Sequence, residues 1–301
     1  MPLPAAITRR KFLKVAGTAA AGSILSPLHA ADAAIEPIPV PTRPFGRTGV
    51  NVPILSFGGS LHLPQLMLRQ AVKWGVTYWD TANSYMGGTS ERRIGKYLTA
   101  FPADRKKIFL VTKSHAWSTE GLNDDLDDSL DRMQTDYVDL FFVHGISSID
   151  ELDEDTRRWS ERKKAEGKVR LFGFSTHSNM EECLLDAADL GWVDAIMMTY
   201  NYRLMHTDEM RRAVDACAEA GIGLTAMKTQ GGGSFHWGGD TAREMTARFL
   251  AKGFTEGQAK LKAVWDNRQI ASICSEMPNM KLLQENVSAA LNRTQLSADD
   301  R

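Results

Sequence analysis

The stretch that decides the fold runs from residue 107 to residue 144 and contains KIFLVTK, LNDDLDDSLDRM and YVDLFFVH in that order. The outer two segments, residues 107–113 and 137–144, are short apolar runs of the kind that forms buried parallel strands. The middle segment, residues 122–133, carries Leu122, Leu126, Leu130 and Met133 at helical spacing. The stretch therefore predicts a strand, a helix and a second strand.

The same alternation continues along the chain. Further helical patterns lie at residues 66–74, 90–101 and 209–221, and further strand patterns lie at residues 53–59, 77–82, 169–175, 194–201, 222–228 and 271–277. Eight strands alternating with about eight helices predict a single-domain α/β fold, an all-parallel (β/α)8 TIM barrel. The alternative is an open doubly wound sheet, which should carry G-x-G-x-x-G after its first strand. The segment FGGSLHLPQ lacks that spacing.

The N-terminal 33 residues are predicted to be a twin-arginine export signal rather than part of the fold. Arg9 and Arg10 precede Phe-Leu-Lys, a mildly apolar run follows, and small residues allow cleavage after Ala30 or Ala33. The alternative is a basic N-terminus that precedes an alanine-rich helix. The signal places the protein in the periplasm or otherwise outside the cytoplasm, with the export machinery as a partner.

Two short segments separate the signal from the barrel. Residues 34–44 are rich in proline and predict an extended linker. The stretch FGRTGVNVP, residues 45–53, contains Gly46 and Gly49 and predicts a tight hairpin that closes the bottom of the barrel. The barrel domain is then expected to span residues 45–301.

Composition limits the class of partner. The net charge is −1 for all 301 residues and −4 without residues 1–33, which argues against nucleic acid as the main partner. No second apolar run is long enough to span a membrane, so we expect no stable membrane anchor. Cys183, Cys217 and Cys274 show no metal-ligand spacing, and small buried packing is their expected role.

Four proton-handling side chains stand where predicted strands end. Asp80, Lys113 and His144 end the second, third and fourth strands, and Tyr85 follows Asp80 on the next loop. Catalytic residues of TIM barrels lie at the carboxyl ends of the strands, and adjacent strands are ~4.8 Å apart. We therefore expect these four side chains to converge in one cluster.

The residue types in this cluster favour proton transfer to an oxygen atom. A tyrosine phenol has a pKa of about 10, and a lysine cation beside it favours the phenolate. An aspartate would hold that lysine charged, and a histidine would donate a hydrogen bond to a substrate oxygen. Taken singly, each residue has a structural reading, such as a helix cap, a solvated lysine or a core histidine. Their order on successive strands favours a shared catalytic role.

At this point the chain resembles the aldo-keto reductase family, from Phe45 to about Ala290. The matching segments are FGRTGVNVPILSFGG, YWDTANSYMGGTSERRIGKYL, IFLVTK, TDYVDLFFVHG, KVRLFGFSTH, AMKTQGGG and LLQENV. The resemblance implies a barrel that binds NADP, with NAD as the alternative, and that transfers hydride to or from a carbonyl substrate. It implies that Tyr85 is the general acid, that Lys113 lowers the pKa of Tyr85, that Asp80 pairs with Lys113, and that His144 orients the carbonyl.

The resemblance also implies a set of cofactor contacts, each to a different part of the dinucleotide. It assigns Ser175 and Thr176 to the nicotinamide amide, Met227 to stacking, Lys228 with Gly231, Gly232 and Gly233 to the phosphates, and Glu285 with Asn286 to the adenine. The remaining implied contacts are Gly59 and Ser60. Thr176, Met197, Met227 and Leu282 depart from the commoner family residues, and Glu276 falls where glycine or lysine is common.

Two other functions remain open on the sequence alone. The departures on the cofactor side, together with export, are compatible with a binding or regulatory barrel that turns over little. A metal-dependent hydrolase would need clustered histidine and carboxylate ligands. His144 and His177 end adjacent strands, but the pattern offers no convincing third ligand, and no metal is expected.

Overall fold

Eight parallel strands close into a barrel in the computed structural model, which describes residues 38–230 and 240–296. The predicted signal and the three glycines Gly231, Gly232 and Gly233 lie outside the described residues. The order around the barrel is β10-β3-β4-β5-β6-β7-β8-β9, which confirms the predicted TIM barrel. The barrel strands are β3 (Leu55–Gly58), β4 (Tyr78–Asp80), β5 (Phe109–Ser114), β6 (Val138–His144), β7 (Val169–Thr176), β8 (Ala195–Thr199), β9 (Gly223–Met227) and β10 (Ile270–Glu276).

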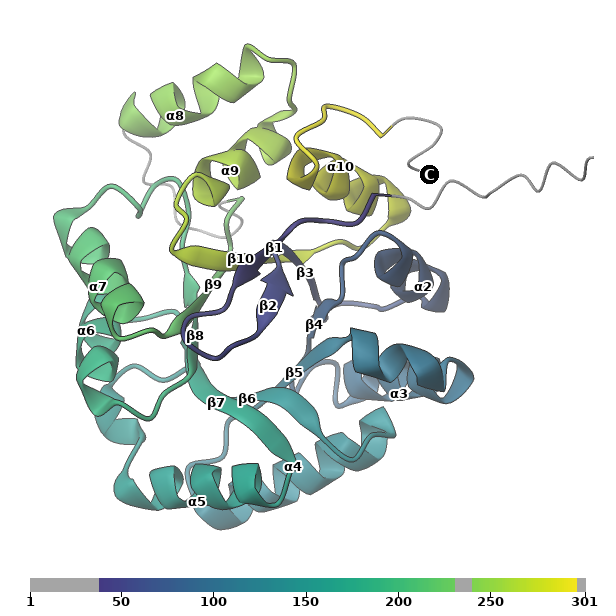
Figure 1. Cartoon of the computed structure of the whole chain (residues 1–301), viewed down its shortest axis with the longest axis vertical. Coiled ribbons are helices and arrows are strands. Elements are labelled where there is room, and N and C mark those ends of the chain that lie inside the picture. Colours follow the sequence, from purple (N-terminus) through teal and green to yellow (C-terminus); the bar gives the residue numbers. More distant parts are fainter. Residues whose placement is uncertain (1–37, 231–239, 297–301) are drawn as a thin grey trace, which may run out of the picture. The chain divides into compact units, whose positions relative to one another are not determined.

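Helices alternate with these strands and surround the barrel (Figure 1). Several begin at a polar cap: Ser118, Asp153, Thr207 and Asn279 each accept a hydrogen bond from a backbone N–H of the first turn. The α-helices are α2 (Gln65–Lys73), α3 (Thr89–Ala100), α4 (Thr119–Met133), α5 (Glu154–Ala165), α6 (Met180–Leu190), α7 (Asp208–Glu219), α8 (Asp240–Leu250), α9 (Glu256–Trp265) and α10 (Met280–Ala290). The short 3-10 turns are η1 (Pro102–Lys107) and η2 (Ile149–Glu151). Among the described residues, no helix has the length and apolar character needed to cross a membrane.

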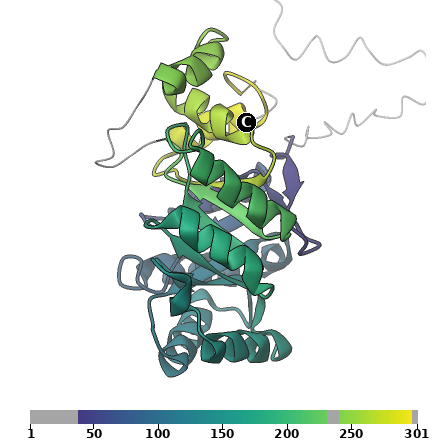
Figure 2. The same ribbon diagram turned by 90° about the vertical axis from the view of Figure 1, so that its left-hand side faces the viewer.

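The predicted hairpin lies across one end of the barrel (Figures 1 and 2). Its strands β1 (Thr42–Pro44) and β2 (Asn51–Pro53) pair antiparallel, and Gly46 and Gly49 adopt the positive φ values of +56° and +76° that the turn requires. The linker prediction over residues 34–44 did not anticipate β1. This strand is held because the buried Arg43 donates hydrogen bonds to the backbone oxygens of Trp265, Asn267 and Ile270.

The core has an inner and an outer part. The larger apolar cluster fills the space between strands and helices. A smaller cluster fills the barrel interior, and the hairpin contributes Phe45 and Val52 to it. The ring of Phe45 meets those of Tyr78 and Phe109 edge-on, at centroid distances of 6.3 and 5.7 Å. These rings fill the barrel interior at the end where the strands begin.

Replacing Phe45 by alanine should therefore destabilise the barrel. Phe45 is fully buried, so its loss should lower the free energy of unfolding by about 3–5 kcal/mol. Urea unfolding followed by circular dichroism measures this change. Leu66→Ala, which truncates a side chain that is 69% exposed, is the matched control and should stay within about 0.5 kcal/mol of wild type. Equal stability of the two variants would contradict the interior role of Phe45.

Candidate active site

The alternation of side chains along each strand aims three of the predicted residues into the barrel. Tyr78, Val111 and Phe142 belong to the interior cluster. Each is followed two positions later by Asp80, Lys113 or His144, so that the later residue faces the same way near the carboxyl end of its strand. The carboxyl ends of β4, β5 and β6 are neighbours in the barrel. Strand periodicity and parallel pairing thus bring the three side chains together, as predicted.

A buried ion pair lies at the centre of this cluster. Lys113 Nζ is 2.6 Å from Asp80 Oδ1, and both side chains are almost fully buried. Lys113 also donates a hydrogen bond of 2.7 Å to the backbone oxygen of Thr81. Burial acts to lower the pKa of Lys113, but the negative charge of Asp80 raises it above its ordinary value. Lys113 is therefore held as a cation.

Tyr85 joins the ion pair from the loop between β4 and α3. Its hydroxyl is 3.4 Å from Lys113 Nζ, within hydrogen-bonding distance. Burial raises the pKa of Tyr85 above its ordinary value, and Lys113 opposes that rise. The resemblance implied that Lys113 lowers the phenol pKa, and Lys113 does act in that direction, but in this pocket burial outweighs it. The phenol therefore keeps its proton near neutral pH, as a proton donor must.

His144 lies beside Tyr85 as a neutral imidazole. The two rings meet edge-on at 5.6 Å, and His115 stacks on His144 at 4.0 Å. Burial, followed by the positive charge of Lys113, lowers the pKa of His144 to about 2. The buried Nδ1 atom of His144 has no hydrogen-bond partner among the described residues. Because Nδ1 is buried, the other ring nitrogen, Nε2, is the one left to contact a ligand.

A pocket of about 500 Å³ opens above this cluster, within the size range of small-molecule sites. Asp80 and Tyr85 form part of its wall, together with residues at the ends of β3, β8, β9 and β10. His177 also lines it, and its Nδ1 atom lies 2.9 Å from the hydroxyl of Thr199. Of the four proton-handling residues, Asp80 and Tyr85 therefore contact a cavity that a ligand can enter, whereas Lys113 and His144 are not part of its wall.

Gly59 and Ser60 line the pocket, as the resemblance implied. A Cβ atom on Gly59 would lie 2.3 Å from the backbone oxygen of Asp80, so only glycine allows this close approach of β3 to β4. Ser60 donates a hydrogen bond to the carboxylate of Glu276, at the end of β10. Burial raises the pKa of Glu276, and Lys228 opposes the rise. The resemblance had singled out Glu276 as a departure on the cofactor side, and the structure places its carboxylate in the pocket wall.

The other implied cofactor residues divide into two groups. Met227 and Lys228 line the pocket, and Lys228 holds a left-handed backbone with φ of +55°. Ser175 and Thr176 are buried at the end of β7 beside it. Ser175 Oγ accepts a hydrogen bond from the N–H of Gly145. Of the four, only Met227 and Lys228 belong to the wall of the pocket.

Glu285 and Asn286 on α10 do not line this pocket. Asn286 is buried, and its amide donates a 3.0 Å hydrogen bond to the hydroxyl of Ser275, which does line it. Glu285 lines a separate hollow beside Lys281, and the two charged groups are 3.9 Å apart. The adenine contacts that the resemblance implied therefore lie away from the pocket of the proton-handling residues.

The implied phosphate loop stays a prediction. Its three glycines, Gly231, Gly232 and Gly233, lie outside the described residues. The described chain reaches the start of that loop, because Lys228, Thr229 and Gln230 all line the pocket. The resemblance assigns Lys228 and the three glycines to the phosphates of the cofactor. Of these four, the described part of the chain places Lys228 at the pocket.

Cys274 is a pocket residue that the sequence interpretation treated as packing. It lines the cavity, where the charge of Asp80 also acts on its thiol. Burial raises the pKa of the Cys274 thiol well above its ordinary value, so it remains protonated. Its position near the end of the eighth barrel strand could have indicated from the sequence that Cys274 lies at the pocket.

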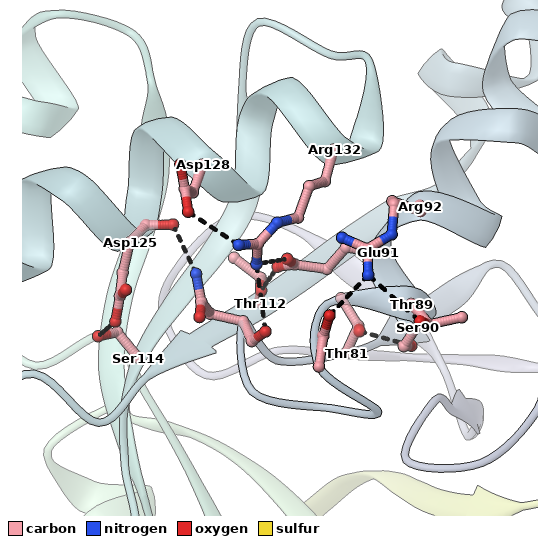
Figure 3. A network of polar contacts seen from close by, with 12 residues as sticks. Thr81, Thr89, Ser90, Glu91, Arg92, Thr112, Ser114, Asp125, Asp128 and Arg132 are labelled. Carbon is pink, nitrogen blue, oxygen red and sulfur yellow. Dashed lines mark hydrogen bonds and ion pairs between the residues drawn. The ribbon is translucent and has the colours of Figure 1, made fainter.

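Glu91 and Arg132 form a second polar group that the sequence interpretation missed. Their carboxylate and guanidinium pair at 3.2 Å (Figure 3), and the guanidinium also contacts the backbone of Asn83 in the loop between β4 and α3. The available signal was the helical pattern of α3, in which Glu91 shares the buried face with Ile94 and Leu98. A charged residue on an apolar helix face indicates a buried partner.

No group of three or more histidine, cysteine, aspartate or glutamate side chains in the described part of the chain is arranged to hold a metal ion. His144 and His177 do lie near the same pocket, where the charge of His177 contributes to lowering the pKa of His144. The metal-dependent hydrolase therefore has no candidate centre in residues 38–230 and 240–296.

Known proteins resemble this chain in sequence. The chain is 25% identical over 287 residues to an L-galactose dehydrogenase of Arabidopsis thaliana, covering 85% of this chain and 90% of that protein. It is 35% identical over 119 residues to the methylglyoxal reductase YeaE of Escherichia coli, covering 38% of this chain and 40% of that protein.

A solved structure shares the fold. The aldo-keto reductase AKR11C1 from Bacillus halodurans, in its holo form, superposes with a TM-score of 0.68 at 24% identity. The match covers 87% of this chain and 94% of that one. The model of the Aldo/keto reductase family matches residues 64–295, most of the described barrel. The chain therefore belongs to the aldo/keto reductase family.

Proposed function

We propose that this protein reduces an aldehyde or ketone to an alcohol with NADPH or NADH, and that Tyr85 is the general acid. The observation that carries this proposal is the contact of Tyr85 with the Asp80–Lys113 ion pair, at a pocket that also receives Asp80. A protonated phenol beside a fixed cation is suited to donate a proton to an oxygen that gains negative charge.

Each residue of the cluster has a separate task in this reaction. The neutral His144 donates a hydrogen bond to the carbonyl oxygen and orients it. Tyr85 gives its proton to that oxygen, and the positive charge of Lys113 stabilises the phenolate that is left. Asp80 keeps Lys113 charged and in place. A bound nicotinamide cofactor would supply the hydride.

The pocket fits such a cofactor with one opposing feature. Its volume, the thioether of Met227 and the cation of Lys228 suit a dinucleotide that carries aromatic rings and phosphates. Glu276 adds negative charge to the same pocket, which opposes phosphate binding. The cation of Lys228 offsets part of this repulsion. We therefore infer that the pocket still binds the cofactor, but with a lower affinity than it would have without Glu276.

The names of two relatives support carbonyl chemistry. One relative is named as a dehydrogenase of L-galactose, and the other as a reductase of methylglyoxal. Both names describe interconversion of a carbonyl and an alcohol. The alternative, an exported barrel that binds a partner with little turnover, draws its support from the carboxylate of Glu276 in the cofactor pocket.

Replacing Tyr85 by phenylalanine tests the proposed chemistry. Loss of the proton donor should lower kcat for aldehyde reduction by about 10²- to 10⁴-fold. Cofactor affinity, measured by quenching of tryptophan fluorescence, should change little. Oxidation of NADPH and NADH with a panel of aldehydes, followed at 340 nm, gives the rates.

Tyr137→Phe is the matched control for this experiment. It removes the same hydroxyl from a tyrosine that contacts Arg105 and Arg170 rather than the pocket, and its rate should equal that of wild type. If wild type oxidises neither cofactor and shows no quenching, the reductase proposal fails and the binding role is favoured.

Replacing Glu276 by glutamine tests the charge of the cofactor pocket. Removing one negative charge should tighten dinucleotide binding by about fivefold, since unit charges about 4 Å apart in watery surroundings interact by about 1 kcal/mol. The gain should be larger for NADPH, which carries an additional phosphate. Fluorescence titration measures both dissociation constants.

The pH dependence of cofactor affinity provides a second test of the charge of Glu276. Because the pKa of Glu276 lies above its ordinary value of 4.5, wild-type affinity should fall as the pH rises through that pKa and Glu276 ionises. Glu276→Gln should lack this fall. Glu219→Gln removes an exposed carboxylate at the C-terminal end of α7 and should behave as wild type. Parallel pH curves for all three proteins would contradict the role of Glu276.

We also propose that the protein is exported through the twin-arginine pathway. The support is the order of Arg9 and Arg10, a mildly apolar run and small residues. Because this pathway carries folded proteins, a cofactor bound in the cytoplasm would travel with the enzyme. Replacing both arginines by lysine should leave the protein in the cytoplasmic fraction, whereas Lys11→Arg/Lys14→Arg should still be exported. Unchanged export of the first variant would refute the proposal.

A further inference from the structure

We propose that Arg132 is a positioning residue for Tyr85: its guanidinium clamps the loop that carries the phenol, and Glu91 ties this clamp to the strand that carries Lys113. The inference rests on the proposed function, since it concerns the same proton donor. Arg132 contacts neither the pocket nor the reacting groups.

The Tyr85 loop needs external support because of its backbone. Residues 81–88 connect β4 to α3, and Met86, Gly87 and Gly88 have φ values of +51°, +60° and +76°. A left-handed conformation is unfavourable for methionine and costs glycine much of its chain entropy. The side chain of Met86 is 49% exposed and anchors little. Backbone hydrogen bonds within the loop, such as that from the N–H of Gly88 to the oxygen of Tyr85, form its turns, and contacts from neighbouring elements fix the loop against the barrel.

Arg132 supplies such contacts from α4 (Figure 3). Its Nη1 atom donates to the backbone oxygen of Asn83 at 3.3 Å and pairs with Glu91 at 3.2 Å, while Nη2 pairs with Asp128 at 2.8 Å. The guanidinium also packs against Gly88, where an added Cβ atom would lie 2.8 Å from Nη1. Arg132 therefore touches the loop on both sides of Tyr85.

Glu91 connects this clamp to β5. Its carboxylate is fully buried, and Oε1 accepts a 2.7 Å hydrogen bond from the hydroxyl of Thr112 while Oε2 faces Arg132. Thr112 precedes Lys113, and the alternation of the strand sends their side chains to opposite faces. The backbone N–H of Asn83 in turn donates to the oxygen of Lys113 at 2.9 Å. The loop and the lysine strand are thus joined through one network.

The contact of Arg132 with the loop is better shielded from water than that of Arg92, the other cation that reaches the loop. Arg92 donates to the backbone oxygen of Gly87 at 2.6 Å, but Arg92 is exposed, so water competes for that contact. The side chain of Arg132 is 23% exposed and its partner Glu91 is fully buried, so water competes much less. Of the two arginines, Arg132 therefore makes the better-shielded contact with the loop that brings Tyr85 to 3.4 Å from Lys113.

The test compares Arg132→Met with wild type in aldehyde reduction. Small displacements of a catalytic group reduce rates strongly, so kcat should fall by about 10²-fold while KM for the cofactor changes little. In a Tyr85→Phe background the same change should add little further loss, because the phenol that Arg132 positions is already absent. Arg132→Lys, which keeps one cation near Glu91 but lacks the forked geometry, should recover part of the rate.

Two further variants separate positioning from folding. Arg132→Met leaves Glu91 buried without its cation, so the double variant Glu91→Gln/Arg132→Met provides a charge-balanced protein with the same expected loss of kcat. Arg105→Met is the matched control. It breaks the buried pair with Asp139 near the amino end of β6, where Arg170 still pairs with that carboxylate, and it should lower stability without lowering kcat per folded molecule.

A spectroscopic measurement needs no turnover. The ring resonance of Tyr85 in protein labelled with ¹³Cζ-tyrosine, assigned with Tyr85→Phe, should shift or broaden in Arg132→Met and not in Arg105→Met. If wild type proves inactive, the reductase proposal fails, and this resonance alone decides the positioning role. An unchanged Tyr85 resonance overturns the inference. A loss of kcat that adds fully to that of Tyr85→Phe overturns it as well.

Discussion

The buried ion pair of Asp80 and Lys113 is the interaction on which the site depends. An ammonium group inside a barrel is costly unless a charge and hydrogen bonds compensate it. Asp80 lies 2.6 Å from Lys113 Nζ, and the backbone oxygen of Thr81 adds a second partner. Burial also raises the pKa of the Tyr85 phenol, so the fixed cation is needed to stabilise the phenolate that forms when the proton leaves.

The sequence predicted the barrel and the meeting of the proton-handling residues because both follow from local patterns. Buried parallel strands are continuous apolar runs, and each of the eight strands was visible in this way. Once strands and connections are known, the parallel barrel brings all carboxyl ends to one face. The convergence of Asp80, Lys113 and His144 is therefore a consequence of topology. It required no knowledge of side-chain contacts.

The rest of the site could not be predicted because it depends on contacts between distant segments. The hydrogen bond from Ser60 to Glu276 joins the first barrel strand to the last, and neither residue has a distinctive local pattern. The proximity of Cys274 to Asp80 likewise joins two segments that are far apart in the sequence. The pKa of Tyr85 is raised by burial and lowered by Lys113, and the net direction depends on the folded surroundings of the phenol.

The two halves of the pocket differ in how their charges are balanced. On the proton-handling side, Asp80 and Lys113 compensate each other, and His144 is neutral, so the charges are fixed before any ligand enters. On the other side, Lys228 and Glu276 face an opening where an anionic cofactor would bring further charge. A preorganised proton donor speeds the chemical step, whereas a carboxylate beside the phosphates weakens binding. For the proposed reductase, this difference predicts that cofactor binding limits the reaction more than proton transfer does.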